Sequence, residues 1–314
     1  MKTVSEFYRL AGGLVRVDWE QEELRSILGP ALAHRLVPAD EARFRIRVRR
    51  DLREWPAAGD NTLQVKDDET GLTVLDGLQS VSHRVEAGNT EAEFACATPL
   101  RLPGAERATP FRFILQRWLA SRQVQILHGG AVGLPGHGAV LLAARGGGGK
   151  SNTMLACLNS PLQVLGEDYL AVDDAAHPRV WALYNTAKLH PPDLARFPEL
   201  AREVDRVPDT VSDKLVLQLA ARHGERWADG LPLRAILVLK ITGSRASRIV
   251  PAKPMEAVKE MLASPLMILP AARRPLFEFI NRLAHSLPVH RLELGTEPPQ
   301  IAAAIHQFVT RPPS

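Results

Sequence analysis

The residues with the clearest chemical capacity form one short run near the middle of the 314-residue chain. An apolar segment, 138–143, leads through Ala144 and Arg145 into four glycines, and Lys150, Ser151 and a helical pattern follow. Glycines let successive backbone N–H groups turn inward toward anionic oxygens, and the start of a helix adds partial positive charge. The order of strand, glycine loop, Lys-Ser and helix therefore predicts a loop that binds nucleotide phosphates.

Each residue of this loop has an expected role. Lys150 would reach the β and γ phosphates, and the Ser151 hydroxyl would bind Mg²⁺. The pattern GxxxxGK[ST] is met at Gly149, Lys150 and Ser151, whereas Ala144 replaces its first glycine. A glycine-rich turn that precedes Lys-Ser by chance is the alternative. We predict ATP and Mg²⁺ as cofactors, with these nucleotide contacts: Ala144, Arg145, Gly146, Gly147, Gly148, Gly149, Lys150, Ser151 and Asn152.

An acidic pair follows the loop. Glu167 and Asp168 come directly after the apolar run 162–165. If that run is a parallel strand beside 138–143, both carboxylates reach the edge of the sheet where the loop begins. We therefore expect them to bind a metal ion or accept a proton. A second pair, Asp173 and Asp174, has two interpretations, a turn, which Asp favours, and a further metal contact.

Apolar strand-like runs alternate with helical patterns through the second half of the chain, which predicts an α/β fold around a mixed sheet. A further helix is expected near 19–28. In the part of the chain from 124 onward, strands are expected at 124–127, 139–143, 162–165 and 233–239. Helices are expected there at 152–158, 255–262, 276–284 and 301–309.

The length of 314 residues favours two domains. We predict a small N-terminal α+β domain at 1–108, a linking helix at 109–123 and a larger α/β domain at 124–314. In the linking helix, Thr109 and Pro110 fit an N-cap and a proline at the first helical position.

The segment 43–49 alternates arginine with apolar residues, so a strand there would place four arginines on one face. One interpretation is a half-buried strand with a solvated face. The other is a docking face for an acidic peptide or protein substrate, because guanidinium groups pair well with carboxylates.

Composition sets the broad class. Hydrophobic residues at 45% and charged residues at 24% are typical of a soluble globular protein. The net charge of +4 is too small to predict a nucleic-acid partner. Cys96 and Cys157 lack zinc-site spacing. No stretch approaches the roughly 20 apolar residues that span a bilayer, and 1–20 lacks the pattern of a signal peptide. We therefore expect a cytoplasmic protein without a membrane partner.

Three segments in order, 127–132, 144–151 and 166–170, resemble the catalytic domain of HPr kinase/phosphorylase and related bacterial kinases. Those proteins place a histidine-containing strand just before the loop and an acidic pair shortly after its helix. The resemblance covers 124–174, is faint from there to the end, and does not extend to that family's regulatory domain. It implies a P-loop-containing, HPr kinase-like catalytic domain with a mixed sheet.

The resemblance also implies roles for individual residues. His128 would lie beside the loop and support the reacting group, and the alternative is a buried histidine bonded to backbone. Asp168 would hold Mg²⁺ together with Ser151, and Glu167 would accept the hydroxyl proton, with the reverse assignment left open. The family's pair is usually Asp-Asp, whereas this chain has Glu167 and Asp168.

Two lysines farther along complete the candidate site. Lys188 and Lys214 occur where related kinases carry basic residues near the transferred phosphate, and ordinary surface lysines are the alternative.

The resemblance implies an ATP-dependent kinase that transfers the γ-phosphoryl group to a hydroxyl of a protein, a ribosomal peptide precursor or a small metabolite. Serine is the leading candidate for the residue that carries this hydroxyl. Two alternatives stay open, a nucleotide hydrolase and a non-catalytic nucleotide-binding sensor or scaffold. The family tends to form multi-subunit assemblies, so a homo-oligomer is an option. The acceptor contacts would come from loops and the N-terminal domain.

Overall fold

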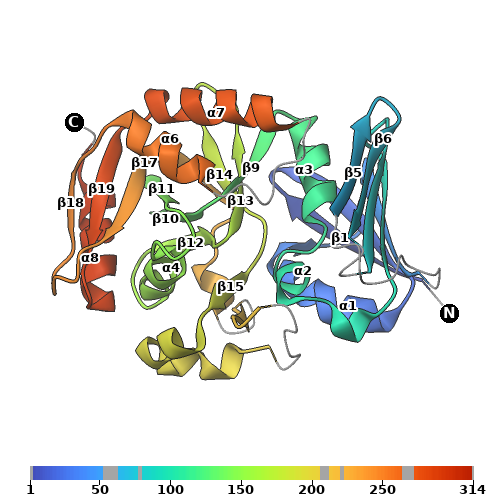
Figure 1. Ribbon diagram of the computed structural model, residues 1–314, viewed down its shortest axis with the longest axis horizontal. Coiled ribbons are helices and arrows are strands. Elements are labelled where there is room, and N and C mark those ends of the chain that lie inside the picture. The colour runs from blue at the N-terminus through green and yellow to red at the C-terminus, as the bar shows by residue number, and fades with distance from the viewer. Residues whose placement is uncertain are drawn as a thin grey trace.

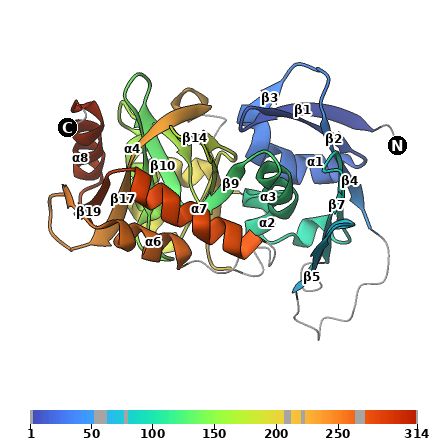
Figure 2. The same ribbon diagram turned by 90° about the horizontal axis from the view of Figure 1, so that it is seen from above.

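The computed structural model describes residues 3–51, 63–76, 80–205, 212–219, 223–263 and 272–312. Two β-sheets stand side by side, and helix α3 (Arg112–Ala120) lies between them (Figures 1 and 2). Within the described ranges, no helix is both long and apolar enough to cross a membrane. The arrangement is a mixed α/β fold, as predicted.

The N-terminal sheet has eight strands in the order β3-β1-β2-β4-β8-β7-β6-β5. β4 runs parallel to both of its neighbours, and the other pairings are antiparallel. The strands are β1 (Val4–Leu10), β2 (Gly13–Trp19), β3 (Leu36–Val37), β4 (Phe44–Arg50), β5 (Leu63–Asp68), β6 (Gly71–Asp76), β7 (Val81–Glu86) and β8 (Glu91–Cys96). The accompanying helices are α1 (Glu22–Leu28), η1 (Gly29–Arg35), η2 (Pro99–Arg101) and α2 (Gly104–Ala108).

Strand β4 shows the predicted alternation. Its three apolar side chains are fully buried in the N-terminal core. On the opposite face, Arg45 pairs with Asp18 of β2, and the Arg49 Nε donates to a Glu93 carboxylate oxygen of β8 at 2.8 Å. These arginines therefore find acidic partners within their own sheet, in keeping with a half-buried strand.

The linking helix is shorter than predicted and is capped differently. α3 begins at Arg112, and Phe111 precedes it in the left-handed conformation with φ 61°. Thr109 instead closes α2, where its hydroxyl donates to the carbonyl of Ala105 at 2.8 Å. The expected N-cap at Thr109 is wrong because the preceding turn of helix already uses that hydroxyl.

The C-terminal sheet has nine strands, seven of them in the order β12-β10-β11-β17-β14-β13-β9, with β19 on β17 and β18 on β19. β11, β17 and β19 are parallel neighbours. The strands are β9 (Val124–His128), β10 (Gly130–Leu134), β11 (Gly138–Ala143), β12 (Gln163–Gly166), β13 (Tyr169–Asp173), β14 (Arg179–Ala182), β17 (Gly230–Ile241), β18 (Arg248–Pro251) and β19 (Val289–Leu294). β15 (Thr186–Leu189) and β16 (Leu215–Gln218) form a separate pair.

Helices cover both faces of this sheet. α4 (Lys150–Leu158) and α8 (Pro298–Thr310) lie on one face, and α6 (Pro254–Leu262) and α7 (Arg273–Ser286) on the other (Figure 1). Short helices η3 (Pro191–Arg196) and η4 (Pro198–Glu203) lie between the two strands of the smaller pair, and η5 (Gly224–Arg226) follows β16. Each strand and helix expected from 124 onward is confirmed, with ends shifted by a few residues.

The position of β12 differs from the prediction. β12 was expected beside β11, but β10 lies between them and is antiparallel to both. Two successive antiparallel pairings restore the direction, so β12 still runs the same way as β11. The acidic pair after β12 therefore reaches the edge of the sheet where the glycine loop begins, one strand farther away than expected.

Polar contacts of buried groups join the chain segments that form the two sheets. Arg35, at the end of η1, is 7% exposed, and its guanidinium pairs with Asp229, directly before β17, and donates to the Ala228 carbonyl at 2.7 Å. In return, the Asn185 amide donates to the Pro30 carbonyl at 2.7 Å. Buried groups joined in this way are costly to separate.

We expect Arg35→Ala to lower the free energy of unfolding by about 1–3 kcal/mol, because it removes charge-assisted hydrogen bonds in a buried setting. Urea-induced unfolding measures this change. Arg274→Ala is the matched control, since Arg274 is 89% exposed in its pair with Glu278 and exposed pairs contribute less than about 1 kcal/mol. Equal losses in the two variants would contradict the structural role of Arg35.

Candidate functional site

The glycine loop joins β11 to α4 in a conformation that requires glycine at some of its positions. Gly147 has φ 75° and Gly149 has φ 90°, values in the left-handed region. A Cβ on Gly148 would lie 2.6 Å from the Cβ of Ala144, and one on Gly149 would lie 2.7 Å from Leu294 Cδ1. Ala144 is not among the residues with positive φ, so its methyl group is tolerated at the first position of the pattern.

Lys150 occupies the first position of α4 and turns its side chain back into the loop. It is 6% exposed, and its ammonium donates to the carbonyls of Ala144 and, at 3.2 Å, Arg145. Burial lowers the pKa of Lys150, and the charges of Glu167 and Asp168 act in the opposite direction. The ammonium is thus enclosed by the loop and within electrostatic range of the acidic pair.

The acidic pair forms the turn between β12 and β13. Asp168 has φ 76°, a left-handed conformation that Asp tolerates better than most residues. Its carbonyl accepts from the Gly129 N–H at 3.1 Å, which anchors the turn to the end of β9. Both Glu167 and Asp168 are buried. Strained backbone of this kind often marks functional sites.

Glu167 contacts the loop directly. The Ser151 hydroxyl donates to its Oε1 at 2.6 Å, and the backbone N–H of Lys188 donates to its Oε2 at 3.1 Å. Burial raises the pKa of Glu167, and the adjacent charge of Asp168 raises it further. Glu167 therefore carries its negative charge at a cost in this structure.

Asp168 has different partners. Its Oδ2 lies 2.6 Å from the Lys188 ammonium, and its Oδ1 lies 3.0 Å from His128 Nε2. Burial acts to raise the pKa of Asp168, but the Lys188 charge and the His128 hydrogen bond outweigh it and lower the pKa below its ordinary value. His128 thus contacts a carboxylate, and not the backbone that the alternative interpretation assigned to it.

The other candidate residues differ in their distance from the glycine loop. Lys214 is half-buried directly before β16, and its positive charge acts on Lys150. Asp173 closes the far end of β13 and accepts the Arg179 N–H at 2.8 Å, and Asp174 pairs with Arg282. The second acidic pair therefore serves the turn and the surface.

Sequence reasoning missed two acidic residues that contact the loop region. The Arg145 N–H donates to a carboxylate oxygen of Glu260, from α6, at 2.8 Å. The Asn152 amide donates to Asp193 of η3 at 3.3 Å. Both partners come from segments distant in sequence, and neither stands in a motif that would single it out.

Comparisons with known proteins add little to this geometry. No family model matches the chain, and no curated protein matches it. Among solved structures, the chain is similar to the HPr(Ser) kinase/phosphatase from Coxiella burnetii, with a TM-score of 0.30 and 10% identity, covering 59% of this chain and 95% of that chain. A likeness at this level carries no argument about function, so the functional interpretation depends on the site itself.

We expect Glu167→Gln to stabilise the fold at pH 8 without Mg²⁺, because it removes a buried charge next to Asp168 while glutamine can still bond both partners. The folded pKa of Glu167 lies above its unfolded value, so its protonated form favours folding below about pH 4.3. That advantage is lost as the pH rises through the folded pKa. Thermal unfolding across this pH range measures the difference.

The gain from Glu167→Gln should therefore be largest at pH 8 and shrink toward pH 4. Glu22→Gln is the matched control, since the Glu22 side chain is 65% exposed and its charge is hydrated in both states. A Glu167→Gln protein less stable than wild type at pH 8 would show that the carboxylate is not strained by burial.

Proposed function

We propose that this chain is an ATP- and Mg²⁺-dependent kinase that transfers the γ-phosphoryl group to a hydroxyl group. The leading candidate for the acceptor is a serine hydroxyl. The observation that carries the proposal is the 2.6 Å bond between Ser151, at the end of the glycine loop, and the Glu167 carboxylate. It brings the loop's expected metal-binding hydroxyl and a buried acid together. Phosphoryl transfer requires mainly such positioning and charge neutralisation.

The loop residues fit a triphosphate. Space is open where a Cβ would stand on Gly146 and on Gly147, so anionic oxygens can approach the backbone there. Lys150 now bonds loop carbonyls, and its ammonium would exchange them for phosphate oxygens. Mg²⁺ typically binds one or two carboxylates together with substrate phosphates, and when bound it would neutralise phosphate charge.

The geometry supports a division of work between the carboxylates. Ser151 contacts Glu167 and not Asp168, so Glu167 and Ser151 would hold Mg²⁺, the reverse of the assignment preferred from sequence. A dication would also relieve the cost of the Glu167 charge. Asp168 stays ionised and is oriented by His128 and Lys188, so it would accept the proton of the acceptor hydroxyl.

We expect Lys150→Ala to reduce the turnover rate by on the order of 10²-fold, as the loss of one preorganised electrostatic donor does, and to weaken the affinity for ATP·Mg²⁺. Isothermal titration and a coupled ATPase or kinase assay measure the two effects. Lys66→Ala, a lysine 68% exposed in the N-terminal sheet, is the control. If the wild-type protein shows no affinity for ATP·Mg²⁺, every nucleotide-dependent function is excluded.

A further experiment separates the kinase from its alternatives. Mass spectrometry of hydroxyl-bearing candidate acceptors, after incubation with enzyme, ATP and Mg²⁺, should find an added phosphoryl mass. ATP consumption that yields free phosphate alone would identify a hydrolase, and tight binding without consumption would identify a sensor or scaffold.

The assignment of the carboxylates has its own test. We expect Glu167→Gln to raise the Mg²⁺ concentration needed for half-maximal rate, since it removes a ligand charge. Asp168→Asn should lower kcat by on the order of 10²-fold or more at saturating Mg²⁺, in line with the loss of a general base. Rates measured across a Mg²⁺ series distinguish the two. The opposite pattern would restore the reverse assignment.

A further inference from the structure

A small hollow adjoins the glycine loop on the side away from the acidic pair's turn. It has a volume of about 240 Å³ and is lined by Gly149, Asn152 and Thr153 from the loop and the first turn of α4. Ile241 and Leu294, the last residues of β17 and β19, line it as well. Gly149 thus belongs both to the loop and to the hollow.

The place of this hollow in the sheet is typical of ligand sites. β11, β17 and β19 are parallel neighbours, and the loop, Ile241 and Leu294 all stand at their carboxyl ends. Ligands of open α/β sheets bind in the crevice outside the carboxyl ends of the strands. The hollow is therefore where the remainder of a ligand held by the loop would extend.

The lining offers an apolar surface that the chain leaves uncovered. Ile241 is 62% exposed, which is unusual for a large aliphatic residue at the end of a central strand, whereas Leu294 and Ile301 behind it are 4% and 2% exposed. Glycine suits position 149, because φ is 90° there and a Cβ would lie 2.7 Å from Leu294 Cδ1. A flat apolar ligand could lie against this surface.

Two polar atoms among the lining residues also lack partners. The Thr153 hydroxyl oxygen and the Asn152 Oδ1 are buried and have no hydrogen-bond partner within the part of the chain that the structure describes. Thr153 itself is 0% exposed. A buried polar atom without a partner is costly, and one that a ligand satisfies is a common feature of binding sites.

We propose that this hollow receives the nucleoside base of the ATP whose phosphates the loop binds. This inference rests on the proposed nucleotide-binding function. The base would cover Ile241, and its ring nitrogens and amino group would pair with Thr153 and Asn152. A volume of about 240 Å³ lies below the range of whole drug-sized ligands, as expected for a subsite that holds one part of the nucleotide.

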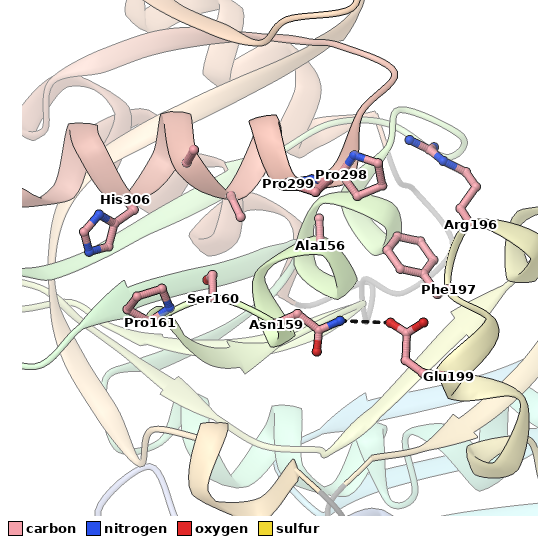
Figure 3. A pocket seen from close by; sticks show the side chains of 12 residues that line it. Ala156, Asn159, Ser160, Pro161, Arg196, Phe197, Glu199, Pro298, Pro299 and His306 are labelled. Carbon is pink, nitrogen blue, oxygen red and sulfur yellow. Dashed lines mark hydrogen bonds between the residues drawn. The ribbon is translucent and has the colours of Figure 1, made fainter.

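A second hollow, of about 500 Å³, lies farther along α4 and is lined by Ala156, Asn159, Pro298 and His306 among others (Figure 3). Asn159 bonds Glu199 across it at 2.9 Å. Ala156 lies seven residues beyond Gly149, about 10 Å along the helix, and no loop residue lines this hollow. It therefore serves as the comparison site in the experiment.

The experiment compares two probes, ATP·Mg²⁺ and inorganic tripolyphosphate·Mg²⁺, by isothermal titration. Ile241→Ser should weaken ATP binding about ten-fold, the effect of losing apolar contact with one aliphatic side chain, and leave tripolyphosphate binding within two-fold. Thr153→Val should also weaken ATP selectively while leaving the fold as stable as wild type or more so, since it removes a buried unpaired hydroxyl. Lys150→Ala should weaken both probes.

Two controls complete the design. Leu100→Ser changes a residue of similar exposure, 67%, in the N-terminal half, and Ala303→Gln changes the larger hollow. Both should bind ATP like wild type. If wild type binds both probes and Ile241→Ser binds ATP as Leu100→Ser does, the inference fails while the proposed function stands. If Ala303→Gln selectively weakens ATP binding, the base binds in the larger hollow and the inference fails. If wild type binds neither probe, both proposals are overturned.

Discussion

Mutual repulsion between two consecutive buried carboxylates, Glu167 and Asp168, is the constraint around which the site is arranged. A buried charge costs several kcal/mol unless it is paired and hydrogen-bonded. The structure gives the ammonium of Lys188 and the imidazole of His128 to Asp168, and a hydroxyl and one backbone N–H to Glu167. The two acids therefore differ in pKa direction although they are neighbours, which is the condition for different chemical roles.

The fold brings these groups together because β11 and β12 run in the same direction, although the two strands are not neighbours in the sheet. β10 separates β11 from β12, yet its antiparallel pairing with both keeps the loop and the acidic turn at one edge of the sheet. β9 ends at the same place, because it pairs with β13 in a register that sets His128 opposite Tyr169, next to Asp168. Three turns that are separate in sequence thus converge without any one of them being long.

Local sequence was sufficient to predict some of this site and insufficient for the rest. The loop from 144 to 151 is a contiguous pattern whose shape depends on its own glycines, and 166–168 follows an apolar strand, so both were predictable. The contact between Glu260 and the Arg145 N–H joins residues 115 apart, and the side chains around Gly149 come from the ends of β17 and β19. Such contacts depend on the order of strands in the sheet, which hydrophobic pattern alone does not specify.

One partner of Asp168 also links the acidic turn electrostatically to residues beside the N-terminal sheet. Burial raises the pKa of Glu106, and the charges of Arg112 and then of Lys188, which pairs with Asp168, act in the opposite direction. Glu106 belongs to α2 and bonds Arg112 of α3 at 2.9 Å, so the charge of Lys188 acts both on the acidic turn and on a buried ion pair beside the N-terminal sheet. Tyr169, the residue after Asp168, is part of the hydrophobic core that also contains the buried residues of the N-terminal sheet. Glu167 therefore contacts the glycine loop through Ser151, while Asp168 contacts Lys188 and His128, so the two neighbouring carboxylates belong to different sets of contacts.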